Sequence, residues 1–270
     1  MRIKMKSVFF CDMIKDTILT GSFEMHKKER KKTSFLYRVI IVILVGIIGF
    51  SLYKIGGILL EYHQGTETYE KLQTLAGAEE EPEYVDFNAL LAENEDVKAW
   101  LYSEGTVINY PVVQGDDNEY YLYHMVNGEW NGKGSIFIDY RCENPFEDFN
   151  TILYGHRMKD GSMFHSLIEY EDPEYFEAHR TLRLILPEES YDIEVFSVMT
   201  IPADSGLYQY DFSGKDEIED YLSRITEESL IDTGVEVSAE DRIVMMSTCT
   251  YEFEQARFVV YGRISQRQKS

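Results

Sequence analysis

Residues 241–264 read DRIVMMSTCTYEFEQARFVVYGRI, and this stretch contains two apolar runs of strand length. The first run is residues 243–246 and the second is residues 258–264. Residues 250–256, which separate Cys249 from Arg257, are few enough for a tight connection between two strands. This pattern predicts that the C-terminal part of the chain consists of neighbouring β-strands.

Five further runs of strand length precede this stretch, and Gly, Asp and Asn residues separate them. Helical segments interrupt the runs and do not alternate with them. The pattern therefore favours a mainly β fold, a closed or nearly closed β-barrel, over a parallel α/β sheet. The five runs are residues 106–113, 134–139, 150–155, 181–186 and 190–200.

Short helices are expected between the strands. Asp86 can cap a helix that continues through Leu91, and Asp172 is followed by Pro173 in the order typical of a helix start. Three more helical segments are predicted: one with Val97, Trp100 and Leu101 at spacings of three and four, one capped by Ser162 with Met163, Phe164 and Leu167, and the amphipathic segment 215–224.

Charge is distributed very unevenly along the chain. The formal net charge is −22, which argues against nucleic acid as a partner because phosphate binding depends on Lys and Arg. Residues 1–38 nevertheless carry ten Lys/Arg against four Asp/Glu, a net charge of +6. Two different environments are therefore expected for the two parts of the chain.

An uncharged apolar run at residues 39–53 follows the basic segment, and apolar residues continue on both sides from Phe35 to Leu60. This length suffices for the ~20 residues that cross a bilayer core. Lys and Arg residues at 27–32 precede the run, so the positive-inside rule places the N-terminus in the cytoplasm and the acidic remainder outside. The sequence predicts a single-pass anchor in the cell membrane with an extracellular domain.

The expected parts are a basic cytoplasmic segment at 1–34, an anchor at 35–60, a stalk and linker at 61–83, a globular domain at 84–266 and a tail at 267–270. Two alternatives stay open for the apolar run. It could be a signal peptide cleaved near Ala76–Ala78, although that site lies far beyond the run, or a buried core helix. Met25 directly precedes the basic cluster and is an alternative start.

The three cysteines, Cys11, Cys142 and Cys249, are too widely separated for a disulfide framework or a zinc site. Cys249 stands at the end of an apolar run, where a strand end could present a nucleophile. A free thiol has a pKa of about 8.5, so a working cysteine needs a nearby cation or base. The alternative for Cys249 is a buried, inert cysteine.

Two other residues at strand ends could assist such a thiol. His156 follows the run 150–155 and precedes a polar loop, which places its imidazole at a barrel rim; an ordinary surface histidine is the alternative. Arg257 follows Cys249 by eight residues and would return beside the thiol on an antiparallel strand. There it could stabilise an oxyanion or merely pair with Glu252 or Glu254.

Two long motifs surround these residues: TILYGHRMKDGSMFHSL at 151–167 and STCTYEFEQARFVVYGRI at 247–264. They closely resemble the histidine and cysteine motifs of class B sortases. NYPVVQGDDNEYYL at 109–122 and GSIFIDYR at 134–141 extend the resemblance, so it spans most of residues 84–265. The N-terminal anchor is also similar to that of the family.

The resemblance implies an eight-stranded sortase barrel with N-terminal helices and a helix, residues 215–224, in the loop before the cysteine strand. It implies that Cys249 is the nucleophile, His156 the acid/base residue and Arg257 the oxyanion stabiliser. Contacts to the sorting peptide are expected from Asn109, Val113, Tyr154 and Ser247. Asp160 could orient His156 or be an exposed loop residue, and Cys142 is expected to be structural. No metal or other cofactor is expected.

The implied reaction is transpeptidation. The Cys249 thiolate attacks the carbonyl after the Thr of a sorting motif, and His156 protonates the leaving amine. An amine of the lipid II cross-bridge or a pilin lysine then resolves the thioacyl-enzyme. The implied partners are surface proteins with an NPxTx-like motif, and other motifs stay open. Two alternatives remain: a cysteine peptidase that hydrolyses the same intermediate, and a non-catalytic anchored binding module.

Overall fold

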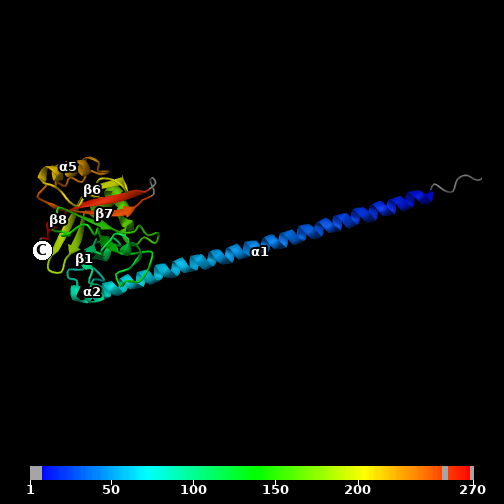
Figure 1. Cartoon of the computed structure of the whole chain (residues 1–270), viewed down its shortest axis with the longest axis horizontal. Helices are drawn as coiled ribbons and strands as arrows, with labels where there is room; N and C mark the ends of the chain where they lie inside the picture. The colour runs from blue at the N-terminus through cyan, green and yellow to red at the C-terminus, as the bar shows by residue number, and fades with distance from the viewer. Residues whose placement is uncertain (1–7, 251–254, 268–270) are drawn as a thin grey trace, which may run out of the picture. The chain divides into compact units, whose positions relative to one another are not determined.

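The computed structural model describes residues 8–250 and 255–267, and it divides the chain into two units, one up to Leu59 and one from Leu60 onward (Figure 1). Helix α1, Val8–Ala76, belongs to both. From Phe35 it is long and apolar enough to cross a membrane, as the sequence predicted. It ends where Gly77 adopts a φ of 65° and the Ala78 N–H donates to the Gln73 carbonyl, a Schellman arrangement.

The second unit is built on a closed barrel of eight strands, which confirms the predicted fold. Its strands follow the order β1-β2-β3-β4-β7-β8-β6-β5, in which β2/β3 and β4/β7 are parallel pairs and all other neighbours are antiparallel. The strands are β1 Val97–Tyr102, β2 Asn109–Val113, β3 Ile136–Ile138, β4 Asn150–Tyr154, β5 Thr181–Ile185, β6 Ser190–Pro202, β7 Arg242–Cys249 and β8 Ala256–Gln266.

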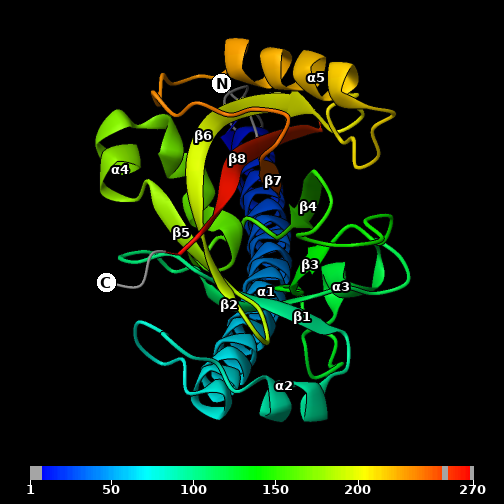
Figure 2. The ribbon, with the colours of Figure 1, turned by 90° about the vertical axis from the view of Figure 1, so that its left-hand side faces the viewer.

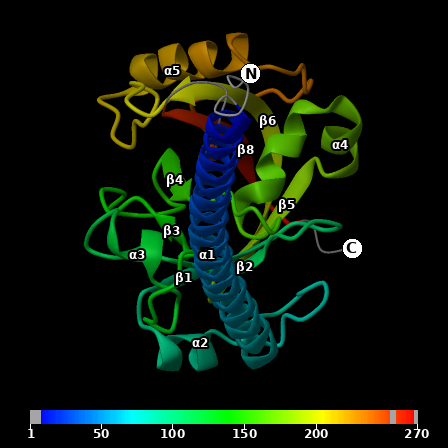
Figure 3. The same ribbon diagram turned by 90° about the vertical axis from the view of Figure 1, so that its right-hand side faces the viewer.

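The connections between strands carry the short helices α2 Phe87–Glu93, α3 Tyr120–Tyr123, η1 Phe164–Glu171, α4 Pro173–Ala178 and α5 Lys215–Glu227. Asp86 and Asp172 cap α2 and α4 as predicted, each accepting from a backbone N–H of the first turn. Helix α5 confirms the predicted helix before the cysteine strand. Figures 2 and 3 show α5 and α2 at opposite ends of the barrel.

Two predicted helix features were wrong. Residues 97–102 form strand β1, in which Ala99, Trp100 and Leu101 are all buried, so the strand lacks the usual alternation of exposed and buried residues. Its apolar spacing therefore imitates a helix. Ser162 does not cap η1, because its hydroxyl donates to Asp160 and Met163 precedes the helix.

The compact unit begins at Leu60, whereas the sequence placed the start of the globular domain near Tyr84. Within the segment expected to be a stalk and linker, Tyr69, Leu72 and Ala76 are buried in the barrel's hydrophobic core cluster. Their spacings of three and four place them on one face of α1. This part of α1 therefore belongs to the globular unit.

Candidate active site

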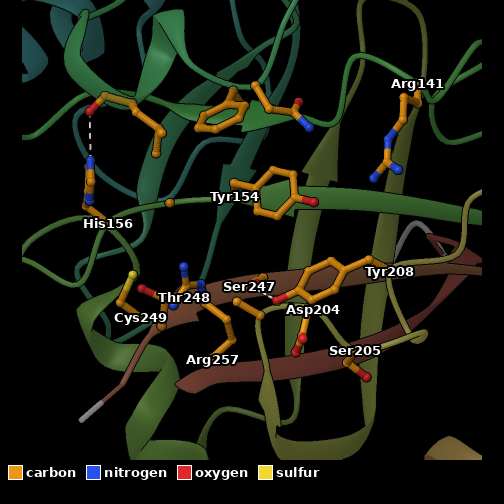
Figure 4. A pocket seen from close by; sticks show the side chains of 15 residues that line it. Arg141, Tyr154, His156, Asp204, Ser205, Tyr208, Ser247, Thr248, Cys249 and Arg257 are labelled. Atoms are coloured by element: carbon orange, nitrogen blue, oxygen red, sulfur yellow. Dashed lines mark hydrogen bonds between the residues drawn. The ribbon is translucent and has the colours of Figure 1, made fainter. Parts of the chain in front are cut away.

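The parallel pairing of β4 with β7 brings two chemically important residues to one edge of the barrel. Tyr154, the last residue of β4, pairs with Ser247 of β7. His156 and Cys249 each lie two residues further along, and residues two apart in an extended chain share a face. All four residues line one cavity (Figure 4).

The antiparallel pairing of β7 with β8 adds the third residue. Cys249 is the last residue of β7, and its cross-strand partner on β8 is Arg257, as expected from the eight-residue separation. Gln255, with a φ of 60°, precedes β8, and the Thr250 N–H donates to the Ala256 carbonyl. Arg257 therefore returns beside the thiol and lines the same cavity of about 460 Å³.

A backbone carbonyl fixes the orientation of the His156 ring. The Nε2 atom lies 2.7 Å from the Leu122 carbonyl oxygen, which can only accept a hydrogen bond, so Nε2 carries the proton. The neutral ring then has its lone pair on Nδ1. In Figure 4 the Cys249 sulfur points toward this ring. Such an arrangement leaves Nδ1 as the atom that can exchange a proton at the site.

Cys249 is a free, half-buried thiol, and Arg257 contributes a permanent positive charge beside it. One Arg257 nitrogen, Nη1, donates to the Ala256 carbonyl at 3.1 Å. A guanidinium has five N–H donors, so further donors remain for an oxygen held in the cavity. A thiol, an imidazole and a guanidinium thus line one cavity, and groups of these types can supply the nucleophile, the proton carrier and the cation that acyl transfer needs.

Two tyrosines form the wall of the cavity next to these residues. The Tyr154 and Tyr208 rings are stacked with centroids 6.0 Å apart, and the Tyr208 hydroxyl lies 2.8 Å from the Ser247 hydroxyl. Burial raises the pKa of Tyr208, which therefore stays a neutral hydrogen-bonding group. The cavity consequently offers aromatic faces and hydroxyls to an extended ligand.

An ion pair between the buried Asp139 and the partly exposed Arg141 supports Tyr154. The Tyr154 hydroxyl donates to Asp139 at 2.9 Å, and Arg141 holds both oxygens of that carboxylate at 2.8 and 2.7 Å. Burial raises the pKa of Asp139, but hydrogen bonds from Arg141 and Tyr154 outweigh it and the net pKa is lowered. Asp139 is therefore an acceptor that holds the Tyr154 hydroxyl in place.

Of the expected peptide contacts, Tyr154 and Ser247 line the cavity but Asn109 and Val113 do not. The Asn109 side chain accepts from Trp100 Nε1 and donates to the Ala78 carbonyl, each at 2.7 Å, and Val113 is fully buried. Both residues stabilise the fold around β2.

The structure adds lining residues that the sequence analysis did not identify. Asn118 and Leu122 lie within the quoted motif 109–122, and Arg141 ends the motif 134–141, so these two motifs contained the signal although the positions chosen from them were different. Tyr208 lies on the connection between β6 and α5, outside every quoted motif.

Asp160 and Cys142 have other surroundings. The Asp160 carboxylate pairs with Lys133 at 2.7 Å and accepts from Ser162, so its partners are not His156. Cys142 is buried, and its sulfur lies 4.0 Å from the Asn150 carbonyl. It does not line the cavity.

Comparison with known proteins agrees with this geometry. The family model of the sortase domain matches residues 101–265. Sortase B of Listeria monocytogenes is 36% identical over 245 residues, covering 87% of this chain and 98% of the relative. Sortase B of Staphylococcus aureus is 32% identical over 240 residues, covering 87% and 97%.

Solved structures give the same result. The structure of Bacillus anthracis sortase B in complex with AAEK1 has a TM-score of 0.70 at 40% identity and covers 78% of this chain and all of that chain. The Staphylococcus aureus sortase B-substrate complex has a TM-score of 0.70 at 32% identity, covering 77% of this chain and all of that one. The chain therefore belongs to the sortase family of cysteine transpeptidases and, within it, to class B.

Proposed function

We propose that this class B sortase cleaves a C-terminal sorting motif after its Thr and transfers the acyl group to an amine of the cell-wall precursor or of a pilin. The observation that carries the proposal is the meeting of Cys249, His156 and Arg257 at one cavity lined by tyrosines. The proposed partners are surface proteins with an NPxTx-like motif.

The first half of the proposed reaction forms a thioacyl-enzyme. The Cys249 thiolate attacks the carbonyl carbon of the Thr, and the resulting oxyanion accepts hydrogen bonds from Arg257. His156 takes part in this step as the imidazolium, protonated at both nitrogens: Nε2–H stays engaged with the Leu122 carbonyl, and Nδ1–H gives its proton to the leaving amine. The C–N bond breaks, and the C-terminal fragment leaves with its new proton.

The second half reverses these roles for a different amine. The incoming amine attacks the thioester carbonyl, His156 accepts its proton and Arg257 again stabilises the oxyanion. Collapse of this intermediate expels the Cys249 thiolate and forms an amide bond. A donor to such an oxyanion typically contributes ~3 kcal/mol to transition-state stabilisation.

Tyr154, Ser247 and Tyr208 are proposed to bind the sorting peptide next to the thiol. Their hydroxyls and ring faces line the cavity, and the contacts among them hold the wall in one arrangement. Leu122 lies beside His156, Asn118 also lines the cavity, and both are proposed to contact the same peptide.

The test is intact-mass spectrometry of the full chain in detergent micelles with a panel of sorting-motif peptides, with and without triglycine. We expect an acyl adduct on Cys249 that passes to triglycine and thereby identifies the motif. An adduct that is lost only to water would favour a peptidase. Absence of any adduct while Cys249 still reacts with iodoacetamide would contradict the proposal.

Sortases are membrane-associated enzymes of the cell surface, and the apolar helix from Phe35 fits this location. We propose that the N-terminus is cytoplasmic and the barrel extracellular, because Lys and Arg residues cluster at 27–32. Protease added to intact cells should remove a C-terminal tag and spare an N-terminal one; the reverse pattern would contradict this topology.

A further inference from the structure

Lys133 is a buried cation close to the cavity but outside it. Its side chain is only 2% exposed, and its ammonium nitrogen lies 2.7 Å from Asp160 Oδ2, 2.9 Å from Thr66 Oγ1 and 3.1 Å from Ser162 Oγ. An ammonium has three donors, and these three acceptors satisfy all of them. Burying a charge is costly unless it is paired and hydrogen-bonded, so the position of Lys133 is strongly specified.

The acceptors of Lys133 come from two different segments. Thr66 belongs to α1, whereas Asp160 and Ser162 belong to the loop that follows His156. This loop closes on itself, because the Phe164 N–H donates to the His156 carbonyl at 3.0 Å and Arg157 bridges Met163. Fixing the tip of the loop at Asp160 therefore also fixes its base, which carries His156.

Burial raises the pKa of Asp160, but hydrogen bonds from Lys133 and Ser162 outweigh this effect and lower its pKa overall. The carboxylate is therefore ionised at neutral pH. Lys133 thus holds the tip of the loop through a charged hydrogen bond, which is stronger than one between neutral groups.

The main chain around Lys133 also holds the acceptor of the His156 ring. The Ser135 N–H donates to the Tyr121 carbonyl and the Asn131 N–H to the Tyr123 carbonyl, both at 2.9 Å. These two bonds bracket Leu122, whose carbonyl accepts from His156 Nε2. Segment 131–135 therefore contacts both the loop of His156 and the residue that orients its ring.

Helix α1 supports segment 131–135 from the other side. Glu61 accepts from the Gly132 N–H at 2.6 Å and from Asn131 Nδ2 at 2.9 Å, and the Tyr69 hydroxyl donates to the Gly134 carbonyl. A continuous set of contacts thus runs from α1 through segment 131–135 to the loop that carries His156 and to Leu122, whose carbonyl holds the His156 ring.

We infer that Lys133 is a positioning residue that ties the His156 loop to α1 and keeps Nδ1 of His156 directed at the site of proton transfer. The inference rests on the proposed acid/base role of His156. Lys133 itself does not line the cavity and acts only through the loop.

The central variant is Lys133→Met, which keeps the length of the side chain and removes its charge. Lys159→Met is the matched control, because Lys159 is an exposed lysine of the same loop. The double variant Lys133→Met/Asp160→Asn removes the unpaired carboxylate as well. If the single variant unfolds, the double variant is used in its place, since it leaves no carboxylate without its cation.

Two substrates separate positioning from general damage. One is an NPxTx-type peptide, and the other is its thioester analogue with sulfur in place of the scissile amide nitrogen. The amine needs a proton from His156 to leave, whereas the thiolate leaves without one. We expect Lys133→Met and the double variant to lower the single-turnover rate of thioacyl-enzyme formation at least tenfold with the amide and at most threefold with the thioester; the later transfer to an amine is the same for both substrates. Lys159→Met should change neither rate by more than twofold.

A second measurement needs no substrate. In the ¹⁵N-histidine spectrum of the full chain in micelles, the neutral form of His156 should be predominantly the Nε2–H tautomer, and Lys133→Met should shift that form toward a mixture of tautomers. If no wild-type adduct forms with either peptide, the proposed function fails while this spectrum still tests the positioning role. Equal losses for amide and thioester, or an unchanged tautomer and an unchanged amide rate in Lys133→Met, would overturn the inference.

Discussion

Cys249 and Arg257 are direct cross-strand partners at the end of the β7/β8 ladder. The two residues therefore keep a fixed separation set by the sheet and not by a loop. Cross-strand neighbours have Cβ atoms about 4.5–5.5 Å apart, which is within reach of a long guanidinium for an oxygen bound at the thiol. This relationship makes the contribution of Arg257 directly testable.

Arg257→Ala is expected to lower kcat for amide transfer by about 10²- to 10³-fold, the usual effect of losing one oxyanion donor. The kcat of Arg257→Lys should lie between those of the wild type and Arg257→Ala, because lysine keeps the charge but lacks the planar guanidinium with its paired donors. The rate of acyl-enzyme formation, measured for each variant, gives the size of the loss. Arg263, further along β8 and paired with Glu194, is the control. Similar rates for Arg257→Ala and Arg263→Ala would exclude the oxyanion role.

The hydrogen bond between Tyr208 and Ser247 should couple two walls of the cavity. Removing either hydroxyl leaves the other buried group without its partner, so Tyr208→Phe and Ser247→Ala should each destabilise the fold by about 1 kcal/mol. The double variant should lose little more free energy of unfolding than either single variant does. Urea unfolding of all four proteins gives the coupling energy, and strictly additive effects would contradict the model of a shared bond.

Gly134→Ala should impair catalysis through the Leu122 carbonyl. Gly134 has a φ of 57°, and an added Cβ would lie 2.5 Å from the Leu122 carbonyl oxygen, the acceptor of His156 Nε2. We expect at least a tenfold loss of amide turnover. Gly77→Ala is the matched control, with a φ of 65° but open space around the Cβ. Equal turnover in the two variants would show that backbone strain alone explains the effect.

Cys142 should be unreactive in the folded protein. Burial raises the pKa of its thiol from 9.0 to about 11, so little thiolate is present at pH 8.5. Peptide mapping after iodoacetamide treatment at that pH should find Cys249 alkylated and Cys142 intact. Comparable labelling of both cysteines would show that Cys142 is not buried as described.

The same shift makes stability depend on pH. The unfolded thiol loses its proton near pH 9 and the folded thiol near pH 11, so between these values the unfolded state binds fewer protons. The stabilisation is complete below pH 9 and is lost as pH rises toward 11, by about 2–3 kcal/mol at most. Cys142→Ala should flatten the unfolding free energy over this range, and an unchanged slope would contradict the assignment.

Local chemistry was sufficient to predict the strands other than β1, the caps at Asp86 and Asp172, and helix α5. In each case the deciding signal lies within a few neighbouring residues, such as a carboxylate placed before a helical run. The apolar segment from Phe35 is equally local, since bilayer thickness translates directly into a number of residues. Strand β1 was missed because it is buried on both sides, so its apolar spacing has no strand period.

The sequence by itself determined the kind of barrel, the anchor and the motifs that carry His156, Cys249 and Arg257. Only the tertiary structure decided that Tyr208 and Asn118 line the cavity while Asn109 does not, that the globular unit begins at Leu60 and that Lys133 holds the His156 loop. The reason is physical. Spacing along the chain encodes which face of an element is apolar. The parallel pairing of β4 with β7 and the contact of buried Lys133 with Thr66 instead join segments that are far apart in sequence. Such long-range contacts are selected by the packing of the whole barrel.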